Sequence, residues 1–117
     1  RFRGGKDVLA SEYLKAMRDL EIFKKQYAAK CSEFDGVILP TCPIMPPNLE
    51  RLESDNGYYV SQNLMALRNT RIGNLMGICS LTIPTTYNSC GLSIMALPNR
   101  EEKLLRLGKA AEMAILK

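Results

Sequence analysis

The sequence predicts an α/β fold in which a mixed β-sheet is flanked by helices. Three observations support this prediction. Helical apolar stripes alternate along the chain with short apolar runs, turn residues bound each run, and the order is helix, strand, helix, strand, strand, helix. With 117 residues, of which 46% are hydrophobic and 24% charged, we expect a single domain over residues 1–117 and no extended disorder.

The first predicted helix runs from about residue 10 to residue 31. Its apolar residues recur at helical spacing while lysine, arginine and aspartate fill the other face; the stripe comprises Tyr13, Met17, Leu20, Tyr27 and Cys31. A turn at Asp35 and Gly36 then leads into Val37, Ile38 and Leu39. Three consecutive apolar residues predict a strand covered on both faces. The prolines that follow exclude a helix and require an extended path.

The middle of the chain is expected to hold one loop, one helix and a hairpin. Residues 48–56 are polar and predict a surface loop that ends in a turn signal. Apolar residues at helical spacing predict a second helix over about residues 58–73. Strands are predicted at residues 80–84 and 91–96, and the turn-rich segment between them allows an antiparallel hairpin.

The last predicted helix has the clearest start signal. Asn99 is a suitable N-cap, and Glu102 lies three residues further on, as in a capping box. The helix then carries an apolar stripe made of Leu104, Leu107, Ala111 and Ile115. This stripe predicts that the helix packs on the sheet.

Histidine and cysteine usage excludes several kinds of site. The sequence contains no histidine, so a Ser-His-Asp triad, a Cys-His dyad and a histidine metal site are excluded from these 117 residues. The cysteines form no Cys-x-x-Cys pair, and we expect no metal and no cofactor; they are Cys31, Cys42, Cys79 and Cys90. We expect buried free thiols, which indicate a reducing compartment and a cytoplasmic protein.

Charge and hydropathy argue against nucleic-acid and membrane partners. Sixteen lysines and arginines against twelve acidic residues give a mild net charge of +4, and many basic residues stand three or four positions from an acid, as Glu21 and Lys24 do. Weak nucleic-acid binding would rest on this net charge alone. No apolar run reaches 18 residues, and we expect no signal peptide. Because the chain opens at Arg1 without an initiator methionine, we expect it to be part of a longer protein.

A candidate binding site lies at the end of the second predicted helix. Thr70, Arg71 and Asn74 would offer a hydroxyl, a guanidinium and an amide to a ligand. The fork of an arginine suits a carboxylate or a carbonyl oxygen. The alternative is a solvated helix end, where Arg68 and Arg71 are favourably placed near the negative end of the helix dipole. Spacing alone favours this alternative.

The order of these motifs resembles the C-terminal part of the amidase signature family. Each motif is common by itself, but the order and spacing are specific and extend from about residue 5 to residue 114. The first two matching pieces are the tyrosine-containing helix of residues 11–31 and the strand that runs into Pro40, Thr41, Cys42 and Pro43. The third is a block that begins at Thr70, continues through residues 74–77 and ends with the strand of residues 80–84. The last two are the closing strand at residues 91–96 and the final helix. One departure is Tyr87, Asn88 and Ser89, where the family usually has Gly-Leu-Pro.

The resemblance implies an amide hydrolase whose catalytic groups lie elsewhere. The family uses a serine nucleophile, a second serine and a lysine, all in its N-terminal half around a Gly- and Ser-rich motif that this sequence lacks. The chain would then be an inactive C-terminal part that supplies sheet, helices and one wall of the cleft for a small amide substrate. Thr70, Arg71 and Asn74 would lie near that wall, with Thr41 and Cys42 at its rim. Thr70 and Asn74 match the family block, whereas Arg71 is predicted from its own chemistry.

Two hypotheses about partners remain open. The C-terminal part of an amidase would need the missing N-terminal part, and its orphaned sheet edges predict a homo-oligomer when it is alone. A stand-alone, non-catalytic α/β protein-interaction module would instead have a closed core without a large exposed apolar patch.

Overall fold

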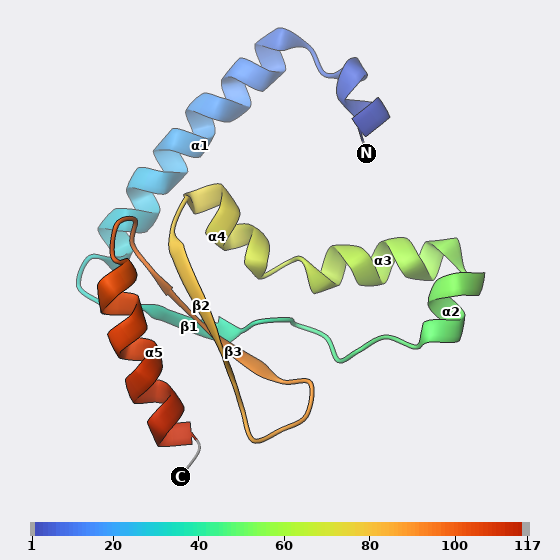
Figure 1. The fold of residues 1–117 in the computed structure, drawn as a ribbon. Coiled ribbons are helices and arrows are strands. Elements are labelled where there is room, and N and C mark those ends of the chain that lie inside the picture. Colours follow the sequence, from blue (N-terminus) through green and yellow to red (C-terminus); the bar gives the residue numbers. More distant parts are fainter. Residues whose placement is uncertain (1, 116–117) are drawn as a thin grey trace.

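The computed structural model describes residues 2–115 and confirms the α/β class. The chain forms a small antiparallel sheet, and several of its helices extend away from that sheet (Figure 1). In chain order they are η1 (Phe2–Asp7), α1 (Ala10–Cys31), β1 (Val37–Pro40), α2 (Leu49–Ser54), α3 (Asn56–Ala66), α4 (Thr70–Met76), β2 (Cys79–Pro84), β3 (Gly91–Ala96) and α5 (Glu101–Ile115).

The strands lie in the order β1-β3-β2, and both pairs are antiparallel. The predicted hairpin is confirmed as β2 and β3. A mixed sheet was expected, but the described strands form no parallel pair because β3 separates β1 from β2, the two strands that run in the same direction. The central strand β3 is therefore the most buried part of the sheet.

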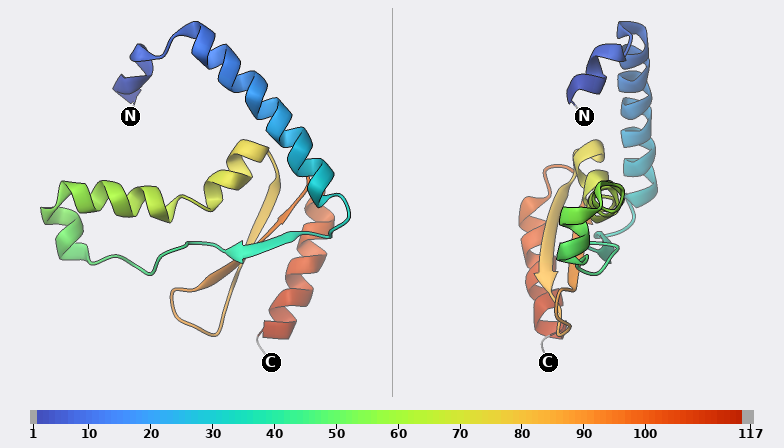
Figure 2. Two further views of the ribbon diagram at one scale, coloured as in Figure 1. Left: turned by 180° about the vertical axis from the view of Figure 1, so that it is seen from behind. Right: turned by 90° about the vertical axis from the view of Figure 1, so that its right-hand side faces the viewer.

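Helices cover the two faces of the sheet unequally (Figure 2). Helix α5 packs on β2 and β3 and closes a small core, which consists of Ile83, Ile94, Ala96 and Leu104. Helix α4 lies against the opposite face, where a Cβ added to Gly73 would be 3.9 Å from Met95 Cε and 4.0 Å from Ser80 Cβ.

Burial is lower than the sequence predicted. The expectation that residues 37–39 are covered on both faces is wrong, because β1 is an edge strand and Ile38 is 67% exposed. The four cysteines are free, as predicted, but none is buried: Cys42 and Cys90 are exposed, and Cys31 and Cys79 are half-buried.

The polar segment before α3 is helical, and the predicted loop there is wrong. The Asn48 side chain accepts a hydrogen bond from the Arg51 N–H at 2.9 Å and caps α2. Asp55 caps α3 in the same way through the Tyr58 N–H. The predicted single helix of residues 58–73 is divided into α3 and α4, because the chain leaves the helix at residues 67–69.

The predicted N-cap of the last helix is also wrong. Asn99 has a φ of 59°, a left-handed conformation that asparagine tolerates better than most residues. Helix α5 begins at Glu101, and the Arg100 carbonyl accepts its first hydrogen bond, from the Leu104 N–H. Asn99 therefore shapes the turn between β3 and α5.

Helix α1 has the predicted bounds but little cover. It projects from the sheet, and only its C-terminal part approaches α4 (Figure 1). Tyr13 and Met17, in the first half of the apolar stripe, are 59% and 41% exposed. None of its residues is buried. This exposed apolar surface argues against the closed core that a stand-alone module requires.

We expect the Asp35 carboxyl to titrate below the ordinary range of aspartate. Its Oδ1 atom lies 2.7 Å from Lys103 Nζ, and the hydrogen bond and the positive charge of Lys103 lower the pKa of Asp35. The ion pair is therefore intact above the ordinary aspartate pKa and is lost as the pH falls through the lowered pKa. An NMR titration of the side-chain carboxyl carbon measures this. Lys103→Met should restore the ordinary pKa, whereas Lys109→Met should leave the lowered pKa unchanged.

Candidate functional site

The end of β1 is fastened to the junction between α3 and α4. Asn69 Nδ2 donates a hydrogen bond to the Pro40 carbonyl at 2.7 Å. Cys42 Sγ donates a longer one, 3.7 Å, to the Ala66 carbonyl. These two bonds place the predicted rim residues Thr41 and Cys42 beside the start of α4, where Thr70 follows Asn69.

Three hydroxyls, from β2, from β3 and from the residue that follows β1, meet at this end of the sheet. Ser93 Oγ lies 2.8 Å from Thr41 Oγ1 and 3.0 Å from Thr82 Oγ1, and Thr41 Oγ1 donates to Thr82 Oγ1 at 3.3 Å. The strand register brings them together. Thr82 of β2 and Leu39 of β1 are both partners of Ser93. Thr41 lies two residues after Leu39 and therefore continues the same face. Ser93 is only 2% exposed. We call Thr41, Thr82 and Ser93 the hydroxyl cluster.

Gly91 permits this approach. A Cβ at Gly91 would lie 3.0 Å from Thr41 Oγ1 and 3.0 Å from Thr82 Cγ2. The Gly91 carbonyl also accepts a hydrogen bond from the Thr41 N–H at 2.9 Å. A side chain at this position would crowd both threonines, and each would have to shift to make room for it.

The predicted residues of α4 share one side of that helix. Thr70 Oγ1 donates to the Leu67 carbonyl at 3.3 Å, so this hydroxyl is used at the start of its own helix. Thr70, Arg71 and Asn74 are all exposed. Because residues three or four apart on a helix are neighbours, Asn74 lies between Thr70 and Arg71, whereas Gly73 faces the sheet. The hydrogen bonds from Asn69 and Cys42 bring the start of this helix to the end of β1.

The sequence reasoning missed Asn69, Thr82 and Ser93. Two signals were available, since Ser93 is the one hydroxyl residue in the apolar strand β3 and Thr82 alternates with apolar residues along β2. Asn69 gave no comparable signal, because its partner is a backbone carbonyl 29 positions away.

The hydroxyl cluster is held together by its own hydrogen bonds. The side-chain hydrogen bonds found for the hydroxyl cluster within residues 2–115 join its members only to one another. A serine becomes a nucleophile only beside a base, and no base contacts Ser93 in this part of the chain. Among the same residues no three histidine, cysteine or acidic side chains are grouped to hold a metal ion, and no helix is long and apolar enough to cross a membrane.

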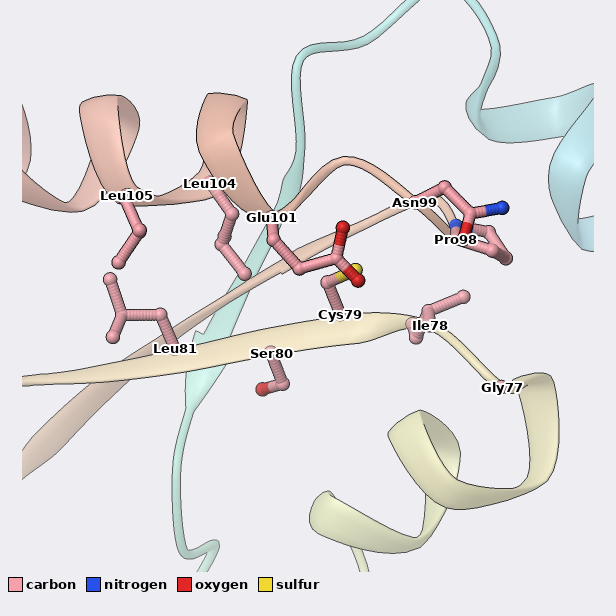
Figure 3. A pocket seen from close by; sticks show the side chains of 10 residues that line it. All are labelled: Gly77, Ile78, Cys79, Ser80, Leu81, Pro98, Asn99, Glu101, Leu104 and Leu105. Atoms are coloured by element: carbon pink, nitrogen blue, oxygen red, sulfur yellow. The ribbon is translucent and has the colours of Figure 1, made fainter.

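A separate groove of about 430 Å³ lies between β2 and α5 (Figure 3). The five residues predicted to bind substrate are not among those that line it. Its lining consists of Gly77, Ile78, Cys79, Ser80, Leu81, Pro98, Asn99, Glu101, Leu104 and Leu105.

Comparison with known proteins identifies the family. A family model described as Amidase matches residues 1–105, which is most of the chain. The chain belongs to the amidase family. The resemblance of the sequence to the C-terminal part of this family is thereby confirmed.

Curated relatives of this amidase chain are much longer than it is. It is 31% identical to the 2-amino-5-chloromuconic acid deaminase of Comamonas testosteroni, over 98% of this chain and 26% of the relative. It is 30% identical to one subunit of the glutamyl-tRNA(Gln) amidotransferase of Sulfolobus acidocaldarius, over 86% of this chain and 21% of the relative. The chain thus spans about a quarter of the length of these relatives. No solved structure gives a significant match.

Proposed function

We propose that this chain is the C-terminal part of an amidase that hydrolyses carbon–nitrogen bonds of amides, with its catalytic Ser, Ser and Lys in the N-terminal part. The observation that supports this most directly is the site itself. Three hydroxyls meet at one end of an incompletely covered sheet, close to the helix that carries Arg71 and Asn74, and within residues 2–115 the buried Ser93 has no side-chain hydrogen bond to a base. In this proposal residues 1–117 are a partial domain that supplies strands, helices and one wall of the substrate cleft.

The substrate would be a small amide held against this wall. Thr70, Arg71 and Asn74 would contact it from α4, while Thr41 and Cys42 would form the rim. The Comamonas relative is named for a substrate that is an acid. The exposed guanidinium of Arg71 suits a carboxylate or a carbonyl oxygen, since it can donate two parallel hydrogen bonds.

A graft tests the proposed function. This chain replaces the matching C-terminal quarter of the Comamonas deaminase, and ammonia release from the deaminase substrate is measured. We expect the graft to be active, and we expect the 117-residue chain alone and the truncated deaminase alone to show no release above buffer. Amide hydrolysis by the chain alone that a serine substitution abolishes would overturn the proposal, as would a folded but inactive graft.

The proposed partner is the N-terminal part of the amidase, and in its absence a second copy of the chain. We place the protein in the cytoplasm, because the four unpaired cysteines suit a reducing compartment. No cofactor, nucleic acid or membrane is part of the proposal.

We expect the isolated chain to form homo-oligomers. The stripe of α1 is an exposed apolar surface in the isolated chain. The two edge strands of the sheet, β1 and β2, offer backbone groups that can form hydrogen bonds to another chain. Light scattering across a concentration series measures the mass. The double variant Tyr13→Glu, Met17→Glu should shift the chain toward monomer, whereas Leu49→Glu on the exposed side of α2 should not. A monomer at the highest concentrations would contradict the expectation.

A further inference from the structure

The side chain of Asn69 acts across the fold rather than on its own helix. Asn69 directly precedes α4 and has helical backbone angles, and its side chain makes no cap bond to that helix. An asparagine at a helix start commonly accepts a hydrogen bond from the first turn. Here the side-chain amide instead donates to the Pro40 carbonyl at 2.7 Å, 29 positions earlier in the chain. The bond therefore joins two elements that are distant in the sequence.

The Pro40 carbonyl points away from the rest of the sheet. The Thr41 N–H donates to the Gly91 carbonyl at 2.9 Å, so the backbone N–H of residue 41 faces β3. Successive residues of a strand direct their polar backbone atoms to opposite sides, and the Pro40 carbonyl consequently faces the open edge of β1. Proline has no N–H, so this carbonyl is its one polar backbone group. Asn69 binds that group.

Few other contacts set the distance between the end of β1 and the start of α4. In residues 2–115 the extensive contacts of β1 are with β3, those of α3 are with α2, and those of α4 are with α1. The covalent path from Pro40 to Asn69 passes through α2 and α3, so the chain itself does not hold the two residues together. The second bond at this junction, from Cys42 Sγ to the Ala66 carbonyl, is longer at 3.7 Å.

Helix α4 is located by Asn69 at its start and by Gly73 in its middle. Gly73 is buried against the sheet, where an added Cβ would contact side chains of β2 and β3. One contact leaves the direction of a short helix free to change, and a second contact at its start fixes that direction. Arg71 lies between the two positions. Loss of the bond from Asn69 would therefore move Arg71 relative to the end of β1.

We propose that Asn69 is a positioning residue of the substrate wall, whose bond to Pro40 sets the distance between the rim residues, Thr41 and Cys42, and the turn of α4 that carries Arg71. This inference rests on the proposed function, in which both groups face one substrate. Asn69 acts through the two segments that it joins. The alternative is that Asn69 only covers an open carbonyl at the sheet edge, which would stabilise the fold without affecting binding.

Steady-state kinetics of the active graft separate these two roles. Asn69→Ala should raise KM by roughly 3- to 10-fold and leave kcat nearly unchanged, because a lost neutral hydrogen bond can shift the arrangement only by its own free energy. Asn69→Gln keeps an amide donor and should restore part of the loss. The matched control is Asn48→Ala, which removes an asparagine hydrogen bond of 2.9 Å at the start of α2. It should lower the free energy of unfolding by a similar amount and leave KM unchanged.

Thiol alkylation of the 117-residue chain reports the position of the rim without any enzymatic activity. Cys42 and Cys90 are both exposed, and the Cys42 thiol is bonded to the Ala66 carbonyl at the end of α3. In Asn69→Ala the rim should separate from α3, so iodoacetamide should alkylate Cys42 at least twofold faster than in the parent. Cys90 is the internal control, and its rate should not change. Mass spectrometry of the digested chain gives both rates.

The outcomes separate this inference from the proposed function. An unchanged Cys42 rate, or a parental KM of Asn69→Ala in an active graft, would overturn the inference and leave the proposed function standing. An equal rise of KM in Asn69→Ala and Asn48→Ala would also overturn it, because general destabilisation would explain both. An inactive graft would overturn the proposed function, and the Cys42 rate would still decide whether Asn69 sets the position of the rim.

Discussion

Leu104→Ala is expected to lower the free energy of unfolding by about 2–5 kcal/mol, the usual cost of a buried leucine with its cavity. Leu104 is 5% exposed and joins α5 to Ile83, Ile94 and Ala96. Domains have only about 5–15 kcal/mol of net stability, and a core of so few buried side chains places this chain at the low end. The isolated variant should therefore be largely unfolded. Urea titrations followed by circular dichroism measure the loss.

The neighbouring position provides a matched control. Leu105 is the next residue on α5 but is 62% exposed, so Leu105→Ala should change the free energy of unfolding by no more than about 0.5 kcal/mol. An equal loss in both variants would mean that α5 does not pack on the sheet through Leu104. The urea concentrations at the midpoint of unfolding can be compared only if both variants show the same slope of unfolding free energy against urea concentration. A changed slope would indicate a different unfolded or native state.

Arg71→Ala in the active graft is expected to raise KM by roughly 10- to 100-fold for the acidic substrate of the Comamonas deaminase. A hydrogen bond to a charged group contributes about 1.5–3 kcal/mol, and about 1.4 kcal/mol corresponds to a factor of ten. Because Arg71 is proposed to hold a part of the substrate that does not react, its loss should leave kcat nearly unchanged. Steady-state rates over a range of substrate concentrations separate the two constants.

Two variants make this prediction specific. Arg71→Lys keeps the charge but loses the planar fork, so its KM should lie between those of the parent and of Arg71→Ala. Arg106 pairs with Glu102 on α5, across the sheet from α4, and Arg106→Ala should not change KM. A parental KM in Arg71→Ala would remove Arg71 from the proposed substrate wall.

Local patterns predicted the elements that depend on local interactions. The bounds of α1 and the hairpin of β2 and β3 followed from helical periodicity and from turn residues between short apolar runs. Helix α2 was missed although Asn48 provided a cap, because the polar composition of that segment suggested a loop. Asn99 was assigned to the helix start because an asparagine suits both an N-cap and a left-handed turn.

Contacts between distant segments could not be predicted in the same way. Thr41 and Ser93 are 52 positions apart, and they meet only because β3 occupies the centre of the sheet. The order of strands in space is not encoded in the periodicity of any one segment. The burial of a residue could not be predicted for a similar reason. The sequence pattern shows that Ile38 and the stripe of α1 are apolar, but it does not show whether another part of this chain covers them.

The direction of the bonds in the hydroxyl cluster follows from the count of its protons. Each hydroxyl carries one proton and Thr41 donates to Thr82, so Ser93 donates to Thr41 and Thr82 donates to Ser93. A group that accepted the Thr41 proton would therefore break only the 3.3 Å bond from Thr41 to Thr82. The cluster could thus offer one proton to a bound group while its two shorter bonds still join the three segments of chain.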